Sequence, residues 1–326
     1  MEIRTFGRLW PVSALTIGGG GLGQVWGPTS RDESVATLRQ AVDSGISLID
    51  VAPSYGDGEA EAVVGDAFGG RLPDGVRVCS KVHVGGYEPS EVDATLRRSL
   101  DESLRRMQIE HLDLFLLHGQ ILPSADPERM AWTTPLDLYE GAVRPALQDL
   151  VDEGRIGAWG ITAVQFPDVL ASVFTSDPAP QAVQVIANVL DSPGDMAWSD
   201  DTVDHRAVAG WARERGIGIM GIRAVQAGGL TDSLDRPLEP GHPARVDFER
   251  AAPLRALADA LGESTAMLAH HYALSMEGVD TVVLGVKNRE ELGECLRVAE
   301  LGPLPDDVLR QVEDLMAPLR EAADAG

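Results

Sequence analysis

Three apolar runs of the sequence each lead into a residue that can carry charge or exchange a proton. Asp50, Lys81 and His118 stand at or just beyond the ends of these runs, and Tyr55 follows Asp50 closely. If the runs are neighbouring parallel strands of a barrel, their carboxyl ends meet at one rim. We therefore expect the four side chains to lie together, although 31 residues separate Asp50 from Lys81 and 37 separate Lys81 from His118.

These four residue types suit the transfer of a proton to a carbonyl oxygen that accepts hydride. A free phenol has a pKa of about 10 and donates its proton poorly unless the phenolate is stabilised. We expect Lys81 to lower the pKa of Tyr55, and Asp50 to keep Lys81 charged and oriented. His118 is expected to donate a hydrogen bond to the substrate oxygen. Tyr55 would then be the general acid of a carbonyl reduction.

Each of the four residues also has a structural explanation when it is taken alone. Asp50 can cap the next turn, and Tyr55 can be ordinary packing. Lys81 can be a solvated strand end, and His118 can bond a backbone carbonyl. However, the chain has only four tyrosines, and its 27 basic residues include only two lysines, Lys81 and Lys287. The joint placement of such rare residues at adjacent strand ends favours catalysis.

Short aliphatic runs alternate with amphipathic stretches along most of the 326 residues. Strands are predicted at Ala14–Gly18, Ser47–Val51, Val76–Lys81, Leu112–Leu117, Ile156–Ile161, Ala182–Ile186, Ile217–Ile222 and Val279–Leu284. Helices are predicted at Asp32–Ser44, Glu59–Phe68, Glu88–Met107, Leu136–Glu153, Pro167–Phe174, Thr202–Arg215, Phe248–Leu261 and Arg289–Ala299. Eight such units predict an α/β fold, a (β/α)8 TIM barrel, with an open doubly wound sheet as the alternative.

Three further segments are expected around the barrel. Ile3–Val12, with Gly7 at a turn, is predicted to form a hairpin that closes the amino-terminal end. Ser264–Ser275 and Leu304–Leu319 are predicted to be extra helices. N-caps are expected at Ser30, Ser90 and Ser264, and helix-ending glycines at Gly45, Gly154, Gly216 and Gly262. Because no linker divides the chain, residues 1–326 are predicted to form a single domain.

The loops after the strands are the expected walls of a substrate pocket, because active sites of such barrels are built there. The long ones are Gly119–Pro135, Leu190–Asp201 and Arg223–Asp247. We predict that Gln120, Trp132 and, from the first loop, Trp26 contact substrate. Solvated loops without a binding role are the alternative.

A glycine run, Gly18–Gly23, satisfies the pattern GxGxxG after the first predicted strand. In a dinucleotide-binding Rossmann turn a helix begins within the glycines, whereas here residues 24–29 intervene before a predicted helix. We therefore expect the glycines to allow close approach to a ligand or a neighbouring strand. Gly21 is predicted to be the point of contact with a cofactor.

Composition limits the classes of partner. A net charge of −24 argues against nucleic acid and anionic membrane surfaces, which need broad basic patches. The sequence shows neither an apolar run of about 20 residues nor a secretory signal, so we expect a cytoplasmic protein. The spacing of Cys79 and Cys295 indicates neither a disulfide framework nor a metal site. The oligomeric state is not determined by the sequence.

At this point the sequence resembles the aldo-keto reductase family. The family's Asp-Thr-Ala-x-x-Tyr-Gly is matched by residues 50–56, Asp-Val-Ala-Pro-Ser-Tyr-Gly. Ser80-Lys81-Val82 and Leu116-Leu117-His118 complete its Asp, Tyr, Lys, His tetrad in order and spacing. Weaker similar strings continue through Gly160-Ile161-Thr162, Gly228-Gly229-Leu230 and residues 284–289.

The resemblance implies a nicotinamide cofactor that lies across the barrel mouth. Its nicotinamide would lie near Asp50, Thr162 and Gln184, with Ile222, Arg223 and Gly285 as further contacts. Its phosphates would lie by the last loop, where Lys287, Asn288 and Arg289 meet the start of a helix. For this reason we expect NADP, with NADPH preferred over NADH. A solvated basic cluster is the alternative.

Three residues depart from the family pattern. Ala163 stands where an Asn usually meets the carboxamide, Ile222 where an aromatic ring often stacks, and Glu291 where some members have a phosphate-binding Arg. The implied activity is the reduction of an aldehyde or ketone, on a small carbonyl or sugar substrate.

Three alternatives to carbonyl reduction remain. The first is a sugar or alcohol dehydrogenase that runs in the oxidative direction. The second is a regulatory barrel that senses redox state and has little turnover. The third is a metal-dependent hydrolase, which lacks support because no HxH pattern is present.

Overall fold

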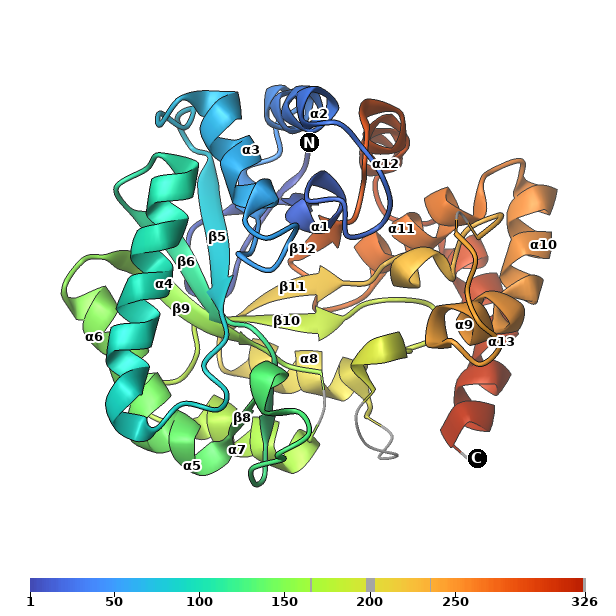
Figure 1. Ribbon diagram of the computed structural model, residues 1–326. Helices are drawn as coiled ribbons and strands as arrows, with labels where there is room; N and C mark the ends of the chain where they lie inside the picture. Colours follow the sequence, from blue (N-terminus) through green and yellow to red (C-terminus); the bar gives the residue numbers. More distant parts are fainter. Residues whose placement is uncertain (165, 198–202, 235, 325–326) are drawn as a thin grey trace.

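Eight parallel strands form a closed barrel in the order β10-β11-β12-β3-β4-β5-β6-β9. The computed structural model, drawn in Figure 1, describes residues 1–164, 166–197, 203–234 and 236–324. The barrel strands are β3 Leu15–Gly18, β4 Leu48–Asp50, β5 Arg77–Val82, β6 Leu112–Leu117, β9 Ile156–Thr162, β10 Ala182–Ile186, β11 Gly218–Ile222 and β12 Thr281–Leu284. All eight predicted strands are confirmed, and closure rules out the open sheet.

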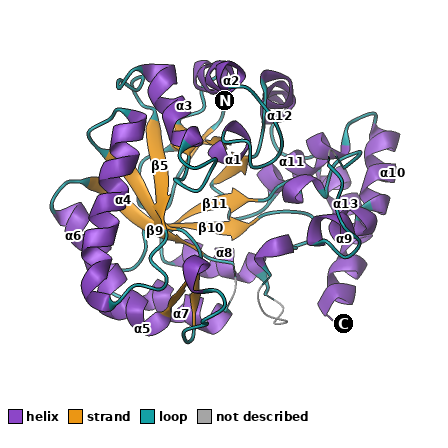
Figure 2. Ribbon diagram, viewed as in Figure 1, coloured by secondary structure: helices purple, strands orange, loops and turns teal. Residues whose placement is uncertain are grey.

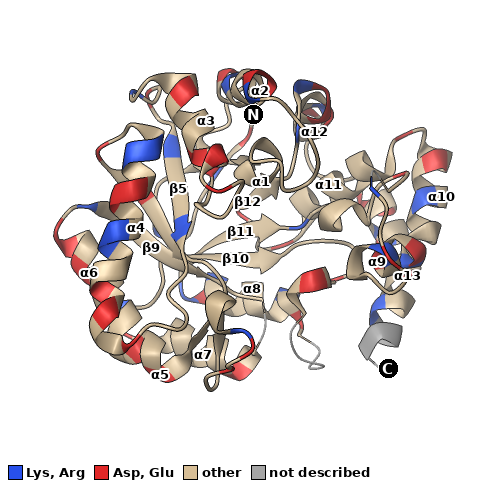
Figure 3. Cartoon of the chain, in the orientation of Figure 1, with Lys and Arg blue, Asp and Glu red and all other residues tan. Residues whose placement is uncertain are grey.

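Helices follow the strands and surround the barrel, as Figure 2 shows. They are α2 Arg31–Asp43, α3 Glu59–Phe68, α4 Val92–Met107, α6 Arg144–Asp152, α7 Pro167–Thr175, α8 His205–Glu214, α10 Ala252–Leu261 and α12 Arg289–Leu301. Shorter helices precede two of them, α5 Leu136–Leu138 before α6 and α9 Pro243–Arg250 before α10. Thr202, where one predicted helix begins, lies outside the described residues. Figure 3 shows acidic and basic residues mixed on outer helices such as α4.

The predicted helix ends are mostly confirmed. Ser30 and Ser264 accept hydrogen bonds from backbone amides as N-caps of α2 and α11 (Thr265–Ser275). The prediction for Ser90 is wrong, because Glu88 and Glu91 form a capping box there and Ser90 lies inside the turn. The four predicted helix-ending glycines all have positive φ: Gly45, Gly154, Gly216 and Gly262.

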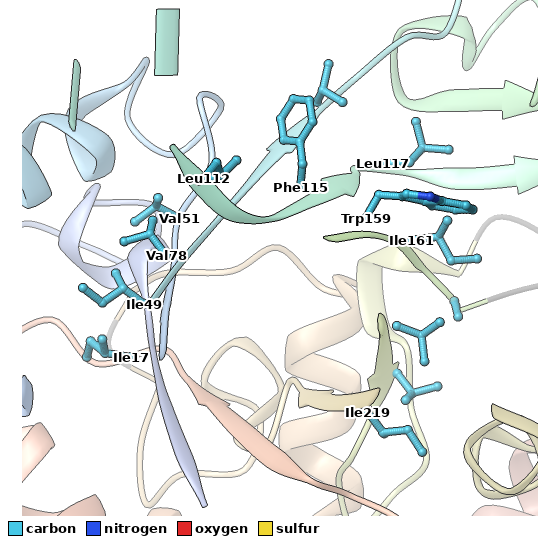
Figure 4. Close-up of a cluster of buried hydrophobic side chains, with 14 of the residues drawn as sticks. Ile17, Ile49, Val51, Val78, Leu112, Phe115, Leu117, Trp159, Ile161 and Ile219 are labelled. Atoms are coloured by element: carbon cyan, nitrogen blue, oxygen red, sulfur yellow. The ribbon is translucent and has the colours of Figure 1, made fainter. Parts of the chain in front are cut away.

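Alternate residues of each strand face opposite sides of the barrel wall, as the two-residue period of a strand requires. Leu114 and Leu116 of β6 belong to the cluster inside the barrel, together with Phe6, Val12, Leu48, Cys79, Ala158, Ala182 and Met220. Phe115 and Leu117 belong to the larger cluster under the helices, part of which Figure 4 shows. The inward rows are therefore mostly apolar at the amino-terminal end of the barrel, where the buried hydroxyls of Thr16 and Thr281 hydrogen-bond to each other.

The predicted hairpin closes this end of the barrel. Its strands β1 Ile3–Arg4 and β2 Val12–Ser13 pair antiparallel, and Gly7 turns with a φ of +51°. The ring of Phe6 is buried against β11, where a Cβ added to Gly218 would stand 2.5 Å from it. The hairpin thus excludes water from the barrel interior below the strand ends.

Extra helices extend the fold beside the barrel (Figure 1). α11 packs against α12 and α10, and α10 packs against α13 Asp306–Asp324. Tyr272 of α11 donates a hydrogen bond to Glu313 of α13. Both predicted extra helices are confirmed. In the described part of the chain, every helix is too short or too polar to cross a membrane.

We predict that Phe6→Ala lowers the free energy of unfolding by about 3–5 kcal/mol, because the change leaves a cavity at the base of the barrel. Ile3→Ala in the same hairpin is the control, since Ile3 is 57% exposed. Its effect should stay within about 0.5 kcal/mol. Urea unfolding followed by circular dichroism measures both, and equal losses would show that the hairpin does not act as a closure.

Candidate active site

The inward-facing rows of the barrel deliver the predicted residues to its carboxyl-terminal mouth. Asp50 lies two residues after Leu48, and Lys81 two residues after Cys79, so both continue rows that face the interior. Asp50 pairs in register with Cys79 across β4 and β5. The strand period and the register together bring the carboxylate and the amine side by side, as the sequence predicted.

Lys81 is fully buried, and its ammonium group contacts three oxygen atoms. Its Nζ lies 2.8 Å from Asp50 Oδ1 in an ion pair. It donates to the backbone oxygen of Val51 at 3.0 Å and to Tyr55 Oη at 3.1 Å. Because an ammonium has three N–H bonds and no acceptor, this set satisfies it. Asp50 is fixed in turn by Gln184, whose Nε2 donates to Oδ2 at 2.9 Å.

The pKa values follow from burial and from these charges. Burial alone would lower the pKa of Lys81, but Asp50 and Tyr55 outweigh burial and raise it above its ordinary value. Burial raises the pKa of Tyr55, and Lys81 opposes this shift. Lys81 therefore lowers the pKa of the phenol as predicted, but burial of the phenolate costs more than Lys81 recovers, so the pKa of Tyr55 is raised.

His118 follows β6 and lies with its ring edge to face against Tyr55, with 5.7 Å between ring centroids. The hydroxyl of Ser54 lies 3.4 Å from His118 Nδ1. Burial, with help from Lys81 and His83, lowers the pKa of His118 well below 6.5. The ring is therefore neutral at pH 7 and able to donate one hydrogen bond without carrying charge.

His83 was missed by the sequence analysis. It lies two residues beyond Lys81, on the same inward row, and its ring stacks on His118 with 4.5 Å between centroids. Burial lowers the pKa of His83 to about 4, with the His118 backbone opposing the shift. The two-residue period from Lys81 was the signal that could have found this residue.

A cavity of about 670 Å³ opens over these strand ends. Most of the predicted site residues line it: Trp26, Asp50, Tyr55, His118, Gln120, Trp132, Thr162, Gln184, Ile222, Arg223, Gly285 and Lys287. Lys81 is not in the wall, but it contacts Asp50 and Tyr55, which both are. Gly21, Asn288 and Arg289 are also absent from the wall, so their predicted cofactor contacts gain no support from its lining.

The glycine run differs from its prediction in one respect. A short helix, α1 Gly19–Leu22, does begin within it. The run nevertheless packs against the last barrel strand, because a Cβ on Gly18 would stand 2.2 Å from the Leu284 oxygen. A Cβ on Gly21 would stand 2.0 Å from the Val286 oxygen. The close approach to a neighbouring strand is confirmed, and Gly21 faces protein rather than the cavity.

At the end of the cavity where a cofactor phosphate was expected, the carboxylate of Glu291 lies against Lys287. Lys287 Nζ lies 3.3 Å from Glu291 Oε1, and the Lys287 amide donates to Glu291 Oε2 at 2.9 Å. Asn288 is the N-cap of α12 and accepts from the Glu291 amide. Arg289 pairs instead with Glu33 of α2 at 2.9 Å. A carboxylate thus occupies the donors at which the sequence analysis placed a phosphate.

The long loops form the other walls, as predicted. Gln120 and Trp132 come from the loop after β6. Arg223, with a left-handed φ of 61°, forms an ion pair with Asp195 of the preceding loop. This ion pair joins two walls of the cavity. No sequence pattern predicted it. The part of the second loop from residue 198 to residue 201 lies outside the described residues.

Two adjacent histidines, His270 and His271, lie in α11. His270 Nδ1 is 2.9 Å from the Ala266 oxygen, and His271 Nε2 is 2.8 Å from the Gly302 oxygen. One nitrogen of each ring is thus within hydrogen-bonding distance of a backbone carbonyl. The described residues contain no cluster of three or more His, Cys, Asp or Glu side chains placed to hold a metal ion.

Several known proteins are similar to this chain in sequence. L-galactose dehydrogenase of Arabidopsis thaliana is 27% identical over 326 residues and covers 98% of this chain and 96% of its own. D-threo-aldose 1-dehydrogenase of Pseudomonas sp is 33% identical over 174 residues, which cover 46% of this chain and 50% of its own.

Solved structures share the fold. An aldo-keto reductase of Klebsiella pneumoniae in complex with NADPH has a TM-score of 0.69 at 24% identity and covers 97% of this chain and 96% of its own. A glycerol dehydrogenase of Gluconobacter oxydans has a TM-score of 0.71 at 23% identity, with coverage of 97% and 95%. The family model for the aldo/keto reductase family matches residues 14–317. The chain is therefore a member of the aldo/keto reductase family and an oxidoreductase.

Proposed function

We propose that this protein transfers hydride between NADP(H) and a small carbonyl or sugar substrate, with Tyr55 as the general acid in reduction. The observation that carries the proposal is the contact of Tyr55 Oη with Lys81 Nζ at 3.1 Å, beside the cavity. Asp50 holds Lys81 from behind, and His118 stands next to Tyr55. This arrangement supplies an acid and an oxyanion site on one wall.

The cavity fits a dinucleotide, because its lining extends from Asp50, Tyr55 and His118 to Lys287 and the first turns of α12. Thr162 and Gln184 would hold the nicotinamide end, with Gly285 along the wall and Lys287 at the phosphate end. When bound, NADPH supplies the hydride. Gly18 and Gly21 maintain the wall by letting α1 pack on the strand and loop behind it.

The chain's own groups control the proton. The raised pKa keeps Tyr55 protonated at neutral pH, although burial by itself also makes the phenol a weaker acid. The phenolate that remains is stabilised by Lys81 at 3.1 Å. The neutral ring of His118 donates a hydrogen bond to the same oxygen without competing for its proton.

Oxidation of an alcohol or sugar by the same site is the second candidate. It is favoured by the relative named L-galactose dehydrogenase, which matches nearly the whole chain. In that direction Tyr55 must act as a phenolate base, which its raised pKa disfavours at neutral pH. A regulatory barrel remains as an alternative that binds cofactor with little turnover.

We predict that Tyr55→Phe lowers kcat/KM for carbonyl reduction by a factor of about 100 or more, because the proton donor is lost. The fold and the cofactor affinity should be retained. Stopped-flow measurement of NADPH oxidation with a panel of aldehydes tests this. Near wild-type turnover by the variant would refute the assigned role. Tight cofactor binding by the wild-type protein without turnover on any carbonyl would favour the regulatory barrel.

The raised pKa of Tyr55 predicts opposite pH dependences for the two directions. Reduction needs the protonated phenol and should stay constant between about pH 6 and 8. Oxidation needs the phenolate and should increase with pH over the same interval. His118, whose pKa lies well below 6.5, adds no further step in this range. Initial rates in both directions check this, and reduction that declines above neutral pH would contradict the raised pKa.

The preference for NADPH over NADH belongs to this proposal and depends on Lys287. Glu291 competes with a 2′-phosphate for that lysine, because its carboxylate already accepts from the Lys287 amide and pairs with its Nζ. We propose that NADPH binds when Glu291 turns away from Lys287. Glu291 therefore weakens a preference that Lys287 creates.

We predict that Glu291→Gln tightens NADPH binding about five- to tenfold and leaves NADH binding nearly unchanged. Glu290→Gln is the matched control, since Glu290 is the exposed neighbour and the change removes the same charge. Quenching of tryptophan fluorescence during titration measures both affinities. If the two variants shift NADPH binding equally, only overall charge matters and Glu291 has no specific role.

A further inference from the structure

Glu61 of α3 is a fully buried carboxylate that the reaction proposed above does not use. Its Oε1 accepts a hydrogen bond from Ser80 Oγ at 2.6 Å, and its Oε2 forms an ion pair with Arg106 Nε at 2.6 Å. A charge removed from solvent lowers stability unless it is paired and hydrogen-bonded, so these two contacts hold the carboxylate in one place. Neither Glu61 nor Ser80 is among the described residues that line the cavity.

The partners of Glu61 join three elements on the outer side of the barrel wall. Ser80 belongs to β5 and Arg106 to α4. The helix α3 packs against α4, and α4 packs against β5 (Figure 1). Because strand residues alternate between the two faces of the wall, Ser80 faces the helices while the next residue, Lys81, faces the interior. The carboxylate therefore fixes, from behind, the strand that carries Lys81.

The first turn of α3 is bonded to the turn that carries Tyr55. The amide of Ala60 donates to the Tyr55 backbone oxygen at 3.2 Å. Gly58, the N-cap of α3, has a φ of +89°, and a Cβ there would stand 2.6 Å from Arg106 Cδ. The side chain of Arg106 thus packs against the start of the helix while its Nε holds Glu61. Both contacts fix the backbone of Tyr55 relative to α3.

These contacts close a ring around the pair formed by Tyr55 and Lys81. The ring contains three hydrogen bonds: Lys81 Nζ to Tyr55 Oη, Ser80 Oγ to Glu61 Oε1, and the Ala60 amide to the Tyr55 backbone oxygen. The peptide bonds that join Ser80 to Lys81 and Ala60 to Glu61 complete it. Loss of any one of the three hydrogen bonds therefore removes a constraint on the other two.

We propose that Glu61 is a positioning residue of the reaction, which acts through Ser80 to hold the amine of Lys81 within hydrogen-bond distance of the Tyr55 hydroxyl. The proposal rests on the proposed function, in which Tyr55 is the general acid. Glu61 acts through the barrel wall, without contact with substrate or cofactor. Small displacements matter here, because a shift of about 1 Å in a reacting group can reduce a rate about 100-fold.

The test is Ser80→Ala, which removes one hydrogen bond of the ring and leaves the ion pair of Glu61 with Arg106. We expect the single-turnover rate of carbonyl reduction at saturating NADPH to fall about five- to tenfold. The Kd for NADPH should stay unchanged, because Ser80 does not line the cavity. Ser80→Thr retains the hydroxyl and should keep the rate within about twofold of wild type. Should Ser80→Ala fail to fold, Ser80→Cys, whose thiol is a weak donor, should show the same decrease.

The pH dependence of alcohol oxidation separates positioning from a general loss of structure. The titratable groups around the phenol of Tyr55 are Lys81, Asp50, Cys79 and His118. Of these, Lys81 lowers the pKa of Tyr55, in opposition to burial. In Ser80→Ala the ammonium is held less closely, so the pKa of Tyr55 should rise further. The increase of the oxidation rate with pH should therefore move to higher pH, while reduction stays independent of pH between about pH 6 and 8.

Ser13→Ala is the matched control. Ser13 is also fully buried, and its hydroxyl donates to the Leu15 backbone oxygen at 2.5 Å, at the opposite end of the barrel. Urea unfolding should show a similar loss of stability for Ser13→Ala and Ser80→Ala. The control should nevertheless keep the wild-type rate and pH profile.

Two outcomes overturn the proposal for Glu61 while the proposed function stands. One is a wild-type rate and pH profile for Ser80→Ala. The other is an equal loss of rate in Ser80→Ala and Ser13→Ala, which would show that lower stability alone slows the reaction. If the wild-type protein reduces no carbonyl at all, the proposed function fails and the role of Glu61 fails with it.

Discussion

The buried ammonium of Lys81 is the interaction on which the rest of the site depends. A charge without exposure to solvent is tolerated only when it is paired and hydrogen-bonded. Asp50, 3% exposed, supplies the pair, and the Val51 carbonyl and the Tyr55 hydroxyl complete the set. Lys81 does not reach the cavity wall itself, and it contacts two residues that do, Asp50 and Tyr55. The hydrogen bond that holds the phenol therefore depends on one ion pair, whereas the pKa of the phenol is set by burial with Lys81 in opposition.

The barrel supplies this ion pair through its two-residue period. The inward row that places Cys79 in the apolar interior continues to Lys81 and then to His83 at the mouth. Apolar residues of several rows pack around Phe6, and the rows of β4, β5, β9 and β10 continue to the polar residues Asp50, Lys81, Thr162 and Gln184. The same strand geometry thus produces both a dry interior and a reactive rim.

The strands, the hairpin and the four proposed catalytic residues were predictable because each depends on local patterns. Apolar runs end where polar residues begin, so the sequence alone places Asp50, Lys81 and His118 at strand ends. Contacts between distant loops left no such pattern. The ion pair of Arg223 with Asp195 joins two loops, and the pairing of Arg289 with Glu33 joins two helices. Both depend on how long connections fold back, which spacing does not determine.

Local motifs gave wrong predictions where contacts with other parts of the fold determine the structure. The glycine run was expected to precede any helix, yet α1 begins at Gly19, since small residues let a short turn pack on β12 and its loop. Lys287 was expected to be free for a phosphate, but Glu291 lies against it one helical turn away. In both cases the residue was identified correctly and its partner was not. Partners across the fold decide what such residues contact.

The most direct test of the account is the effect of Lys81→Met in a Tyr55→Phe background, measured as the single-turnover rate of hydride transfer at saturating cofactor and substrate. If Lys81 acts only through the Tyr55 proton, the double variant should react as slowly as Tyr55→Phe alone, because the group that Lys81 tunes is already absent. If the two losses multiply, Lys81 acts on the reaction by another route, and the central place of its contact with Tyr55 is contradicted.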